Sequence, residues 1–143
     1  MRPPAVAGQF YAGTKPALLK QIQNCYTSKH GPGRIPKVKA GHRKLVGMVA
    51  PHAGYMYSGP VAAHGFARLA EDGMPKSIVI IGTNHTSTGS GVSMMTYGSW
   101  RTPLGEVPID LELAQEIKKA SDIIDIDQVA HVNEHSIEVQ LPF

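Results

Sequence analysis

Apolar residues in this chain fall into short uninterrupted runs and helical stripes, in an order that predicts a mixed α/β fold. Residues 45–50 form an apolar run, and residues 76–81 end in the β-branched run 78–81. Each segment is long enough for a buried strand and too short for a typical helix. Between them, residues 58–72 have apolar positions at helical spacing, with Ser58 or Gly59 suited to cap the helix and Pro60 to its first turn. This order predicts a right-handed βαβ unit, in which both parallel strands end at one edge of a sheet.

Local signals on either side predict the remaining elements. Thr14 is suited to cap a helix that begins near Pro16, and Asp110 to cap a second helix that ends near Lys119. The other segments expected to be ordered are a strand-like stretch at 89–100, a turn at 102–105, a half-exposed strand at 122–129 and the start of a helix at 135–143.

The composition is that of one soluble globular domain. The 143 residues are 42% hydrophobic and 17% charged. No apolar run approaches the roughly 18 to 20 residues of a spanning helix, and the chain start lacks the apolar core of a signal peptide. We therefore expect a cytoplasmic protein without a membrane partner. The single cysteine, Cys25, excludes an internal disulfide and, beside a helical stripe, is expected to be a buried, inert thiol.

Basic residues gather in one connecting stretch. The net charge is +3, and residues 31–44 contain five lysines and arginines together with three glycines and two prolines. This pattern is typical of a solvated surface connection. No aromatic residues are interleaved for base stacking and no nucleic-acid motif is present, so we expect no nucleic-acid partner.

Two histidines occupy equivalent places in the predicted βαβ unit. His52 follows the first apolar run and His85 follows the second. Ligands of open α/β sheets bind outside the carboxyl ends of strands, so this pair favours one metal site. Two imidazoles are one ligand short of the usual three-residue catalytic site. The alternative, in which each histidine only satisfies its own loop, stays open.

A second polar cluster lies near the end of the chain. His135 is a candidate general acid or base, and Glu134 or Glu138 is a candidate carboxylate to orient it. The alternative is a polar helix start with Glu134 near its cap. Tyr55 follows His52 closely, and Asn84 lies in a loop rich in glycine and hydroxyl groups, which favours a metal or polar-substrate loop over a phosphate cradle. The expected substrate pocket therefore contains Tyr55, Asn84, Glu134 and Glu138, although Tyr55 can equally pack against the helix that follows.

Four sequence segments in the same order resemble the Memo family, which is called AmmeMemoRadiSam system protein B in prokaryotes. They are PAVAGQFY at 4–11, APHAGY at 50–55 followed by Ser58-Gly59, GTNH at 82–85 and EHSIEVQLPF at 134–143. Their spread covers essentially the whole chain. The resemblance implies a three-layer α/β/α fold with a largely parallel or mixed central sheet, similar to the class III extradiol dioxygenases that use non-haem Fe(II).

The same resemblance implies roles for individual residues. His52 and His85 correspond to the two metal-binding histidines, and His135 lies in a further histidine motif beside the same cleft, where we expect it to be catalytic. Family proteins are about twice this length, so we expect residues 1–143 to be the amino-terminal portion of a single Memo-like domain, with no second domain. An incomplete sheet of this kind would expose an edge that favours self-association.

The function implied by the resemblance is a dioxygenase-like metal cleft with redox or oxygenase activity. Fe(II) is the expected metal, and histidine ligands are also compatible with Cu or Zn. This chain alone is expected to be inactive and to bind metal weakly or not at all. Two other functions stay open, a non-catalytic peptide-binding scaffold and a Zn-dependent hydrolase. The expected partners are a small molecule or peptide and, by the resemblance, AMMECR-type and radical-SAM proteins.

Overall fold

A computed structural model describes residues 1–40 and 43–143, so part of the basic stretch lies outside the described residues. The chain divides into two compact units, each described here by itself. The sheet unit consists of Met1–Val6 and Ile80–Pro142, and the helix unit consists of Ala7–Val79 with Phe143. Helices and strands occur together, which confirms a mixed α/β chain. No helix in the described ranges is long and apolar enough to cross a membrane.

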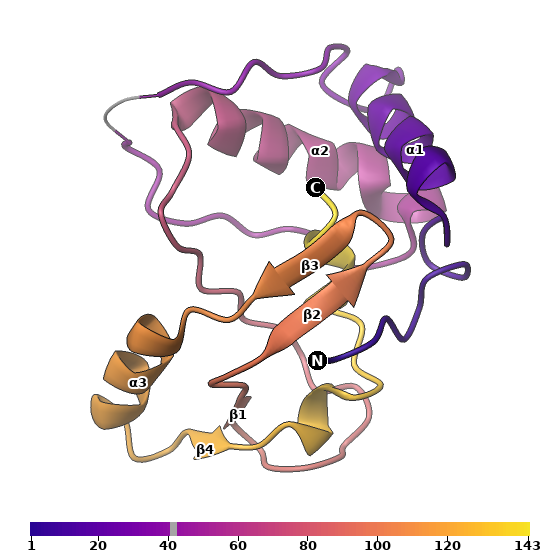
Figure 1. The fold of residues 1–143 in the computed structure, drawn as a ribbon. Coiled ribbons are helices and arrows are strands. Elements are labelled where there is room, and N and C mark those ends of the chain that lie inside the picture. The colour runs from indigo at the N-terminus through magenta and orange to yellow at the C-terminus, as the bar shows by residue number, and fades with distance from the viewer. Residues whose placement is uncertain (41–42) are drawn as a thin grey trace. The chain divides into compact units, whose positions relative to one another are not determined.

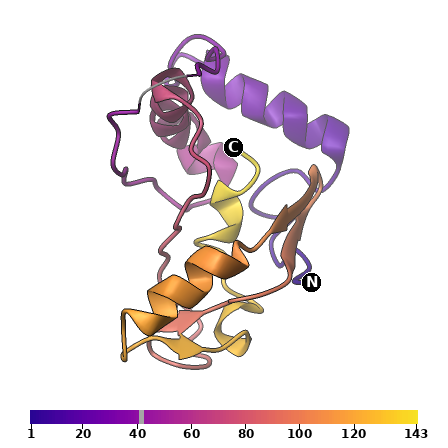
Figure 2. The same ribbon diagram turned by 60° about the vertical axis from the view of Figure 1, so that its left-hand side comes forward.

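Two helices form the core of the helix unit, α1 (Lys15–Thr27) and α2 (Tyr55–Asp72). They cross each other, as Figures 1 and 2 show. The buried stripe of α1 includes Leu18, which is fully buried, and Cys25, which confirms the expected buried thiol. Thr14 stands at the N-cap of α1 as predicted, but its side chain makes no capping hydrogen bond.

The start of α2 differs from the prediction. Gly54 rather than Ser58 or Gly59 is the N-cap, and Pro60 lies inside the helix. The Tyr55 amide donates to the Phe10 carbonyl at 2.7 Å, a contact that fixes the start of the helix and that the local sequence does not reveal. Proline has no N–H, so the helix lacks one hydrogen bond at this position. The predicted end is confirmed, because Gly73 is the C-cap with a φ of +126°.

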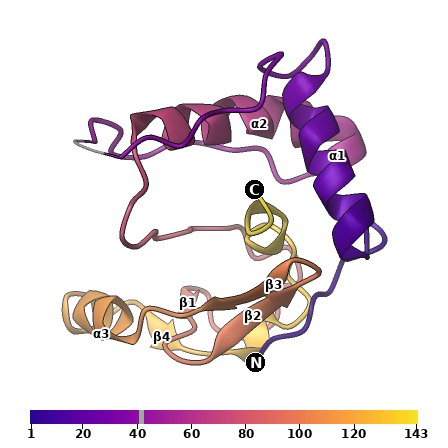
Figure 3. The ribbon, with the colours of Figure 1, turned by 45° about the horizontal axis from the view of Figure 1, so that its top comes forward.

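The sheet unit contains two small sheets and one amphipathic helix. The parallel pair β1 and β4 and the antiparallel hairpin β2 and β3 are visible in Figure 3. The bounds are β1 (Ser93–Met94), β2 (Ser99–Thr102), β3 (Gly105–Pro108), α3 (Leu111–Lys119), β4 (Asp125–Ile126), and the short 3₁₀ helices η1 (Val129–His131) and η2 (Glu138–Gln140). The predicted turn at 102–105 closes the hairpin, and Asp110 caps α3 by accepting from the Leu113 amide at 3.0 Å.

Several predicted elements are shorter or absent. Neither 45–50 nor 76–81 forms a strand, so both strand predictions and the βαβ unit are wrong for this structure. Val46 and Val49 are fully exposed. An apolar run predicts a buried extended segment, but a strand forms only where a neighbour supplies its hydrogen bonds. For the same reason 122–129 contains only the two strand residues of β4, which are the two that pair with β1. The predicted helix start at 135–143 forms only one 3₁₀ turn, η2.

The first residues of the chain lie beside β2 (Figures 1 and 3). The Arg2 amide donates to the Ser99 carbonyl at 2.8 Å, and the Arg101 amide donates to the Arg2 carbonyl at 2.9 Å. These bonds form a parallel bridge between Arg2 and Trp100. They fix the backbone at Arg2, and its side chain enters the interior of the sheet unit.

Candidate metal centre

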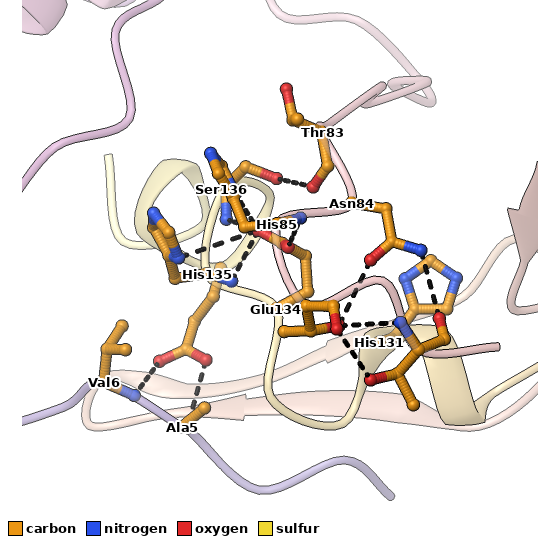
Figure 4. A network of polar contacts seen from close by, with 12 residues as sticks. Ala5, Val6, Thr83, Asn84, His85, His131, Glu134, His135 and Ser136 are labelled. Carbon is orange, nitrogen blue, oxygen red and sulfur yellow. Dashed lines mark hydrogen bonds and ion pairs between the residues drawn. The ribbon is translucent and has the colours of Figure 1, made fainter. Parts of the chain in front are cut away.

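His85 is bound to Glu134 through both its side chain and its backbone (Figure 4). Its Nδ1 lies 2.9 Å from Glu134 Oε1, and its amide donates to Oε2 at 2.6 Å. Glu134 is 3% exposed, whereas the His85 side chain is 39% exposed. The carboxylate is therefore buried beneath an imidazole that reaches toward the surface of the sheet unit.

The Glu134 carboxylate also caps the segment that follows it. Its Oε1 accepts from the amides of His135 at 2.9 Å and Ser136 at 2.8 Å. Burial by itself would raise the pKa of Glu134, but hydrogen bonds from the His85 side chain and from the Ser136 and His85 amides outweigh it and lower the pKa to about 2. Glu134 is thus ionised at neutral pH. The sequence leaves two roles open for Glu134, a cap of the following segment and a carboxylate that orients a histidine. The same carboxylate makes the contacts of both roles.

His135 lies against His85 on the same carboxylate. The two imidazole rings stack with centroids 4.6 Å apart and an interplanar angle of 20°. His135 Nδ1 is 3.7 Å from Glu134 Oε1, longer than a hydrogen bond but within ion-pair range. Both rings therefore turn their Nδ1 atoms toward one anion.

Glu138 is buried in the interior of the sheet unit. It is fully buried, forms an ion pair with Arg2, and accepts from the amides of Ala5 at 2.8 Å and Val6 at 3.0 Å. Its expected place in a substrate pocket stays a prediction, whereas its contacts show what it does structurally. Glu134, not Glu138, is the carboxylate that contacts the histidines.

Arg2 is a residue that the sequence interpretation missed. Its guanidinium donates to the carbonyls of His131 at 2.9 Å and Glu134 at 2.6 Å and lies 4.2 Å from the centre of the Trp100 ring. The available signal was an arginine in an otherwise apolar, proline-rich start, because such a side chain is rarely buried unless it is paired. Its partner Glu138, however, is 136 residues away in the sequence.

The loop that carries His85 packs closely on the segment after Glu134. The Ser136 hydroxyl donates to the Thr83 carbonyl at 3.1 Å. A Cβ at Gly82 would lie 2.4 Å from Ser136 Oγ and 2.7 Å from Ile137 Cγ1, so only glycine permits this approach. Asn84 stabilises its own loop by donating to the Thr88 carbonyl at 3.0 Å. Its predicted contact with substrate stays a prediction.

His131 lies deeper in the sheet unit. It is 8% exposed, and its ring meets the Trp100 ring edge-on with centroids 5.9 Å apart. Burial is the largest cause that lowers the pKa of His131 below its ordinary value, so the neutral imidazole is favoured. Its Nε2 is buried without a hydrogen-bond partner in the described part of the chain.

His52 and Tyr55 belong to the helix unit. His52 is half-buried in the loop before α2, where the Ser58 hydroxyl donates to the Ala53 carbonyl at 3.0 Å. Tyr55 is 3% exposed, and its ring lies 5.6 Å from that of Tyr11 and 4.9 Å from that of Phe143. Tyr55 therefore packs within an aromatic cluster, as the alternative interpretation expects. Within one unit, the structure brings together His85, Glu134 and His135.

Comparison with known proteins gives a consistent result over the whole chain. The model of the Memo-like protein family matches residues 2–143. A MEMO1 family protein of Methanothermobacter thermautotrophicus is 54% identical over 143 residues, which are 100% of this chain and 51% of the relative. Corresponding proteins of Methanopyrus kandleri and Sulfurisphaera tokodaii are 54% and 50% identical, over 99% and 100% of this chain and 50% and 51% of their own lengths. The chain thus spans about half the length of these relatives.

Proposed function

Because the chain belongs to the Memo-like protein family, we propose that it is a metal-binding protein whose ligands are the imidazoles of His52, His85 and His135. Each of the three can offer one ring nitrogen to a metal ion. His52 and His85 are included on the family resemblance described above. His135 is included because it shares with His85 a stacked arrangement over one buried carboxylate, which favours a ligand over the isolated acid or base expected from the sequence.

The paired histidines over Glu134 carry the proposal, because their chemistry fits a metal. Histidines that bind metals commonly donate their other ring N–H to a carboxylate, which orients the ring and increases its basicity. His85 makes this contact at 2.9 Å. An all-imidazole donor set suits Fe(II), Cu and Zn, and we propose Fe(II) on the family resemblance. A bound Fe(II) would supply Lewis-acid and redox chemistry with open coordination positions.

The finer expectations become parts of the same proposal. We place the chain in a three-layer α/β/α fold related to the class III extradiol dioxygenases, with a small molecule or peptide as its ligand and dioxygenase-like chemistry in the full-length relatives. The proposal also includes a cytoplasmic location, self-association, and AMMECR-type and radical-SAM proteins as partners. Asn84 near the ligands is the residue proposed to contact the substrate.

Anaerobic Fe(II) titration monitored by calorimetry tests the ligand assignment. We expect His52→Ala, His85→Ala and His135→Ala each to weaken binding by at least about tenfold, because each removes one donor. His64→Ala is the matched control, since His64 is an exposed histidine in α2 that contacts the His30 carbonyl. Wild-type affinity in both His52→Ala and His85→Ala would contradict the proposal.

Two further measurements separate the remaining functions. Metal analysis of protein purified without a metal-affinity tag distinguishes iron from zinc, and zinc with hydrolytic activity would replace the proposed dioxygenase-like chemistry. Peptide binding that is unchanged by a chelator would favour a scaffold in which the cleft has no catalytic role.

A further inference from the structure

The donors around Glu134 determine which way its hydrogen bonds run. Three backbone amides, those of His85, His135 and Ser136, point at the carboxylate from 2.6 to 2.9 Å. A backbone amide can only donate, so both carboxylate oxygens act as acceptors. Oε2 accepts from the His85 amide, and Oε1 accepts from the other two.

The proton on His85 follows from this arrangement. Its Nδ1 lies 2.9 Å from Oε1, which is an acceptor, so Nδ1 must be the donor. A neutral imidazole protonated on Nδ1 carries its lone pair on Nε2. His135 Nδ1 lies 3.7 Å from the same oxygen, so the same preference acts on His135 more weakly.

The carboxylate is held more firmly than the imidazoles that it contacts. The Glu134 carbonyl accepts from Arg2 at 2.6 Å, and the adjoining Ser136 side chain is bonded to the Thr83 carbonyl at 3.1 Å. Glu134 is 3% exposed, compared with 39% for the His85 side chain. The anion is therefore the more buried member of the pair, and its place is set by the surrounding backbone.

We infer that Glu134 is the positioning residue of this centre, and that its carboxylate holds His85 in the tautomer with the proton on Nδ1 and the lone pair on Nε2, while it biases His135 more weakly toward the same tautomer. One anion thereby orients the His85 ring, which presents its Nε2 atom as a metal donor. This inference rests on the proposed function, since the Nε2 lone pairs are assigned to a metal.

The tautomers can be measured in metal-free protein by two-dimensional ¹H–¹⁵N NMR of the imidazole rings at neutral pH. In the wild type we expect a protonated Nδ1 on His85, and a smaller bias of the same sign on His135. In Glu134→Ala we expect both rings to shift toward the Nε2-protonated form, and Fe(II) affinity to fall by about 10- to 100-fold. Glu134→Asp, which keeps the anion, should recover part of both effects if it folds like the wild type.

Glu116→Gln is the matched control, because Glu116 is an exposed carboxylate in α3 that pairs with Lys119. It should change neither the tautomers nor the affinity. An Nε2-protonated His85 in the wild type would overturn the inference without any variant having to fold. Unchanged tautomers and affinity in a folded Glu134→Ala would also overturn it, while leaving the histidine ligands in place. Conversely, the wild type and all variants could fail to bind Fe(II) while His85 carries its proton on Nδ1 in the wild type and loses this preference in Glu134→Ala. That result would refute the proposed function and support the positioning role of Glu134.

Discussion

Replacement of Arg2 by methionine tests how much of the stability of the sheet unit depends on one buried ion pair. Arg2 is 5% exposed and Glu138 is fully buried. Methionine keeps the length and the apolar stem of the side chain but removes the charge. Breaking a buried pair by removing one partner costs about 3–5 kcal/mol, because the remaining charge is left uncompensated. The carbonyls of His131 and Glu134 also lose a donor, so we expect a loss toward the upper end of that range.

Urea denaturation followed by circular dichroism at neutral pH measures this loss. A domain is typically stable by about 5–15 kcal/mol, so Arg2→Met should shift the midpoint strongly. Adding Glu138→Gln removes the orphaned charge and keeps one oxygen, which can accept from only one of the Ala5 and Val6 amides, because in the wild type these amides bond to different carboxylate oxygens. The double variant should therefore recover part of the loss, on the order of 1 kcal/mol, relative to Arg2→Met.

Arg34→Met is the control for this experiment. Arg34 pairs with Glu71 on the surface of the helix unit, where its side chain is 62% exposed, and exposed pairs contribute about 0–1 kcal/mol. The reasoning is refuted if Arg2→Met costs no more than this control. It is also refuted if the double variant is less stable than Arg2→Met, because the orphaned charge would then not be the cause.

Two other properties follow from the packing of the units. Burial lowers the pKa of His131 from its ordinary value of 6.5, so the stability associated with its neutral form is complete above about pH 6.5 and is lost as the pH falls through the lowered folded-state pKa. Urea midpoints measured from about pH 8 to about pH 5 should decline, and a decline equally steep in His131→Asn would contradict the assignment. In the helix unit, a Cβ at Gly59 would lie 2.5 Å from Cys25 Sγ, so Gly59→Ala should cost about 1–3 kcal/mol by overpacking. Thermal melting should show a smaller cost of Gly59→Ala in a Cys25→Ala background, and an equal cost would exclude this contact as the cause.

The helices could be predicted from the sequence because their signals are local. Asp110 at the start of α3 and Lys118 and Lys119 at its end act within a turn of the residues that they stabilise. The runs at 45–50 and 76–81 have the composition of strands, but the hydrogen bonds that would make them strands must come from elsewhere. The composition of these segments therefore indicates that they can form strands. It does not indicate whether a neighbouring strand is present to pair with them.

The candidate site shows the same division between local and distant information. His85 and His135 could be singled out from the residues around them, and Glu134 could be named as a carboxylate able to orient a histidine. That Glu134 contacts His85, 49 residues earlier, could not be read from the spacing. The contact of Arg2 with Glu138 could not be predicted either, because the residues around Arg2 and around Glu138 do not indicate that these two side chains pair.

The close approach at Gly82 has a consequence for how this protein can vary. The space that a Cβ would need at residue 82 is filled by Ser136 and Ile137. A larger residue at 82 is therefore accommodated only together with smaller ones at 136 and 137. Since these segments carry His85 and His135, we expect substitutions at 82 and at 136 or 137 to have non-additive effects on stability.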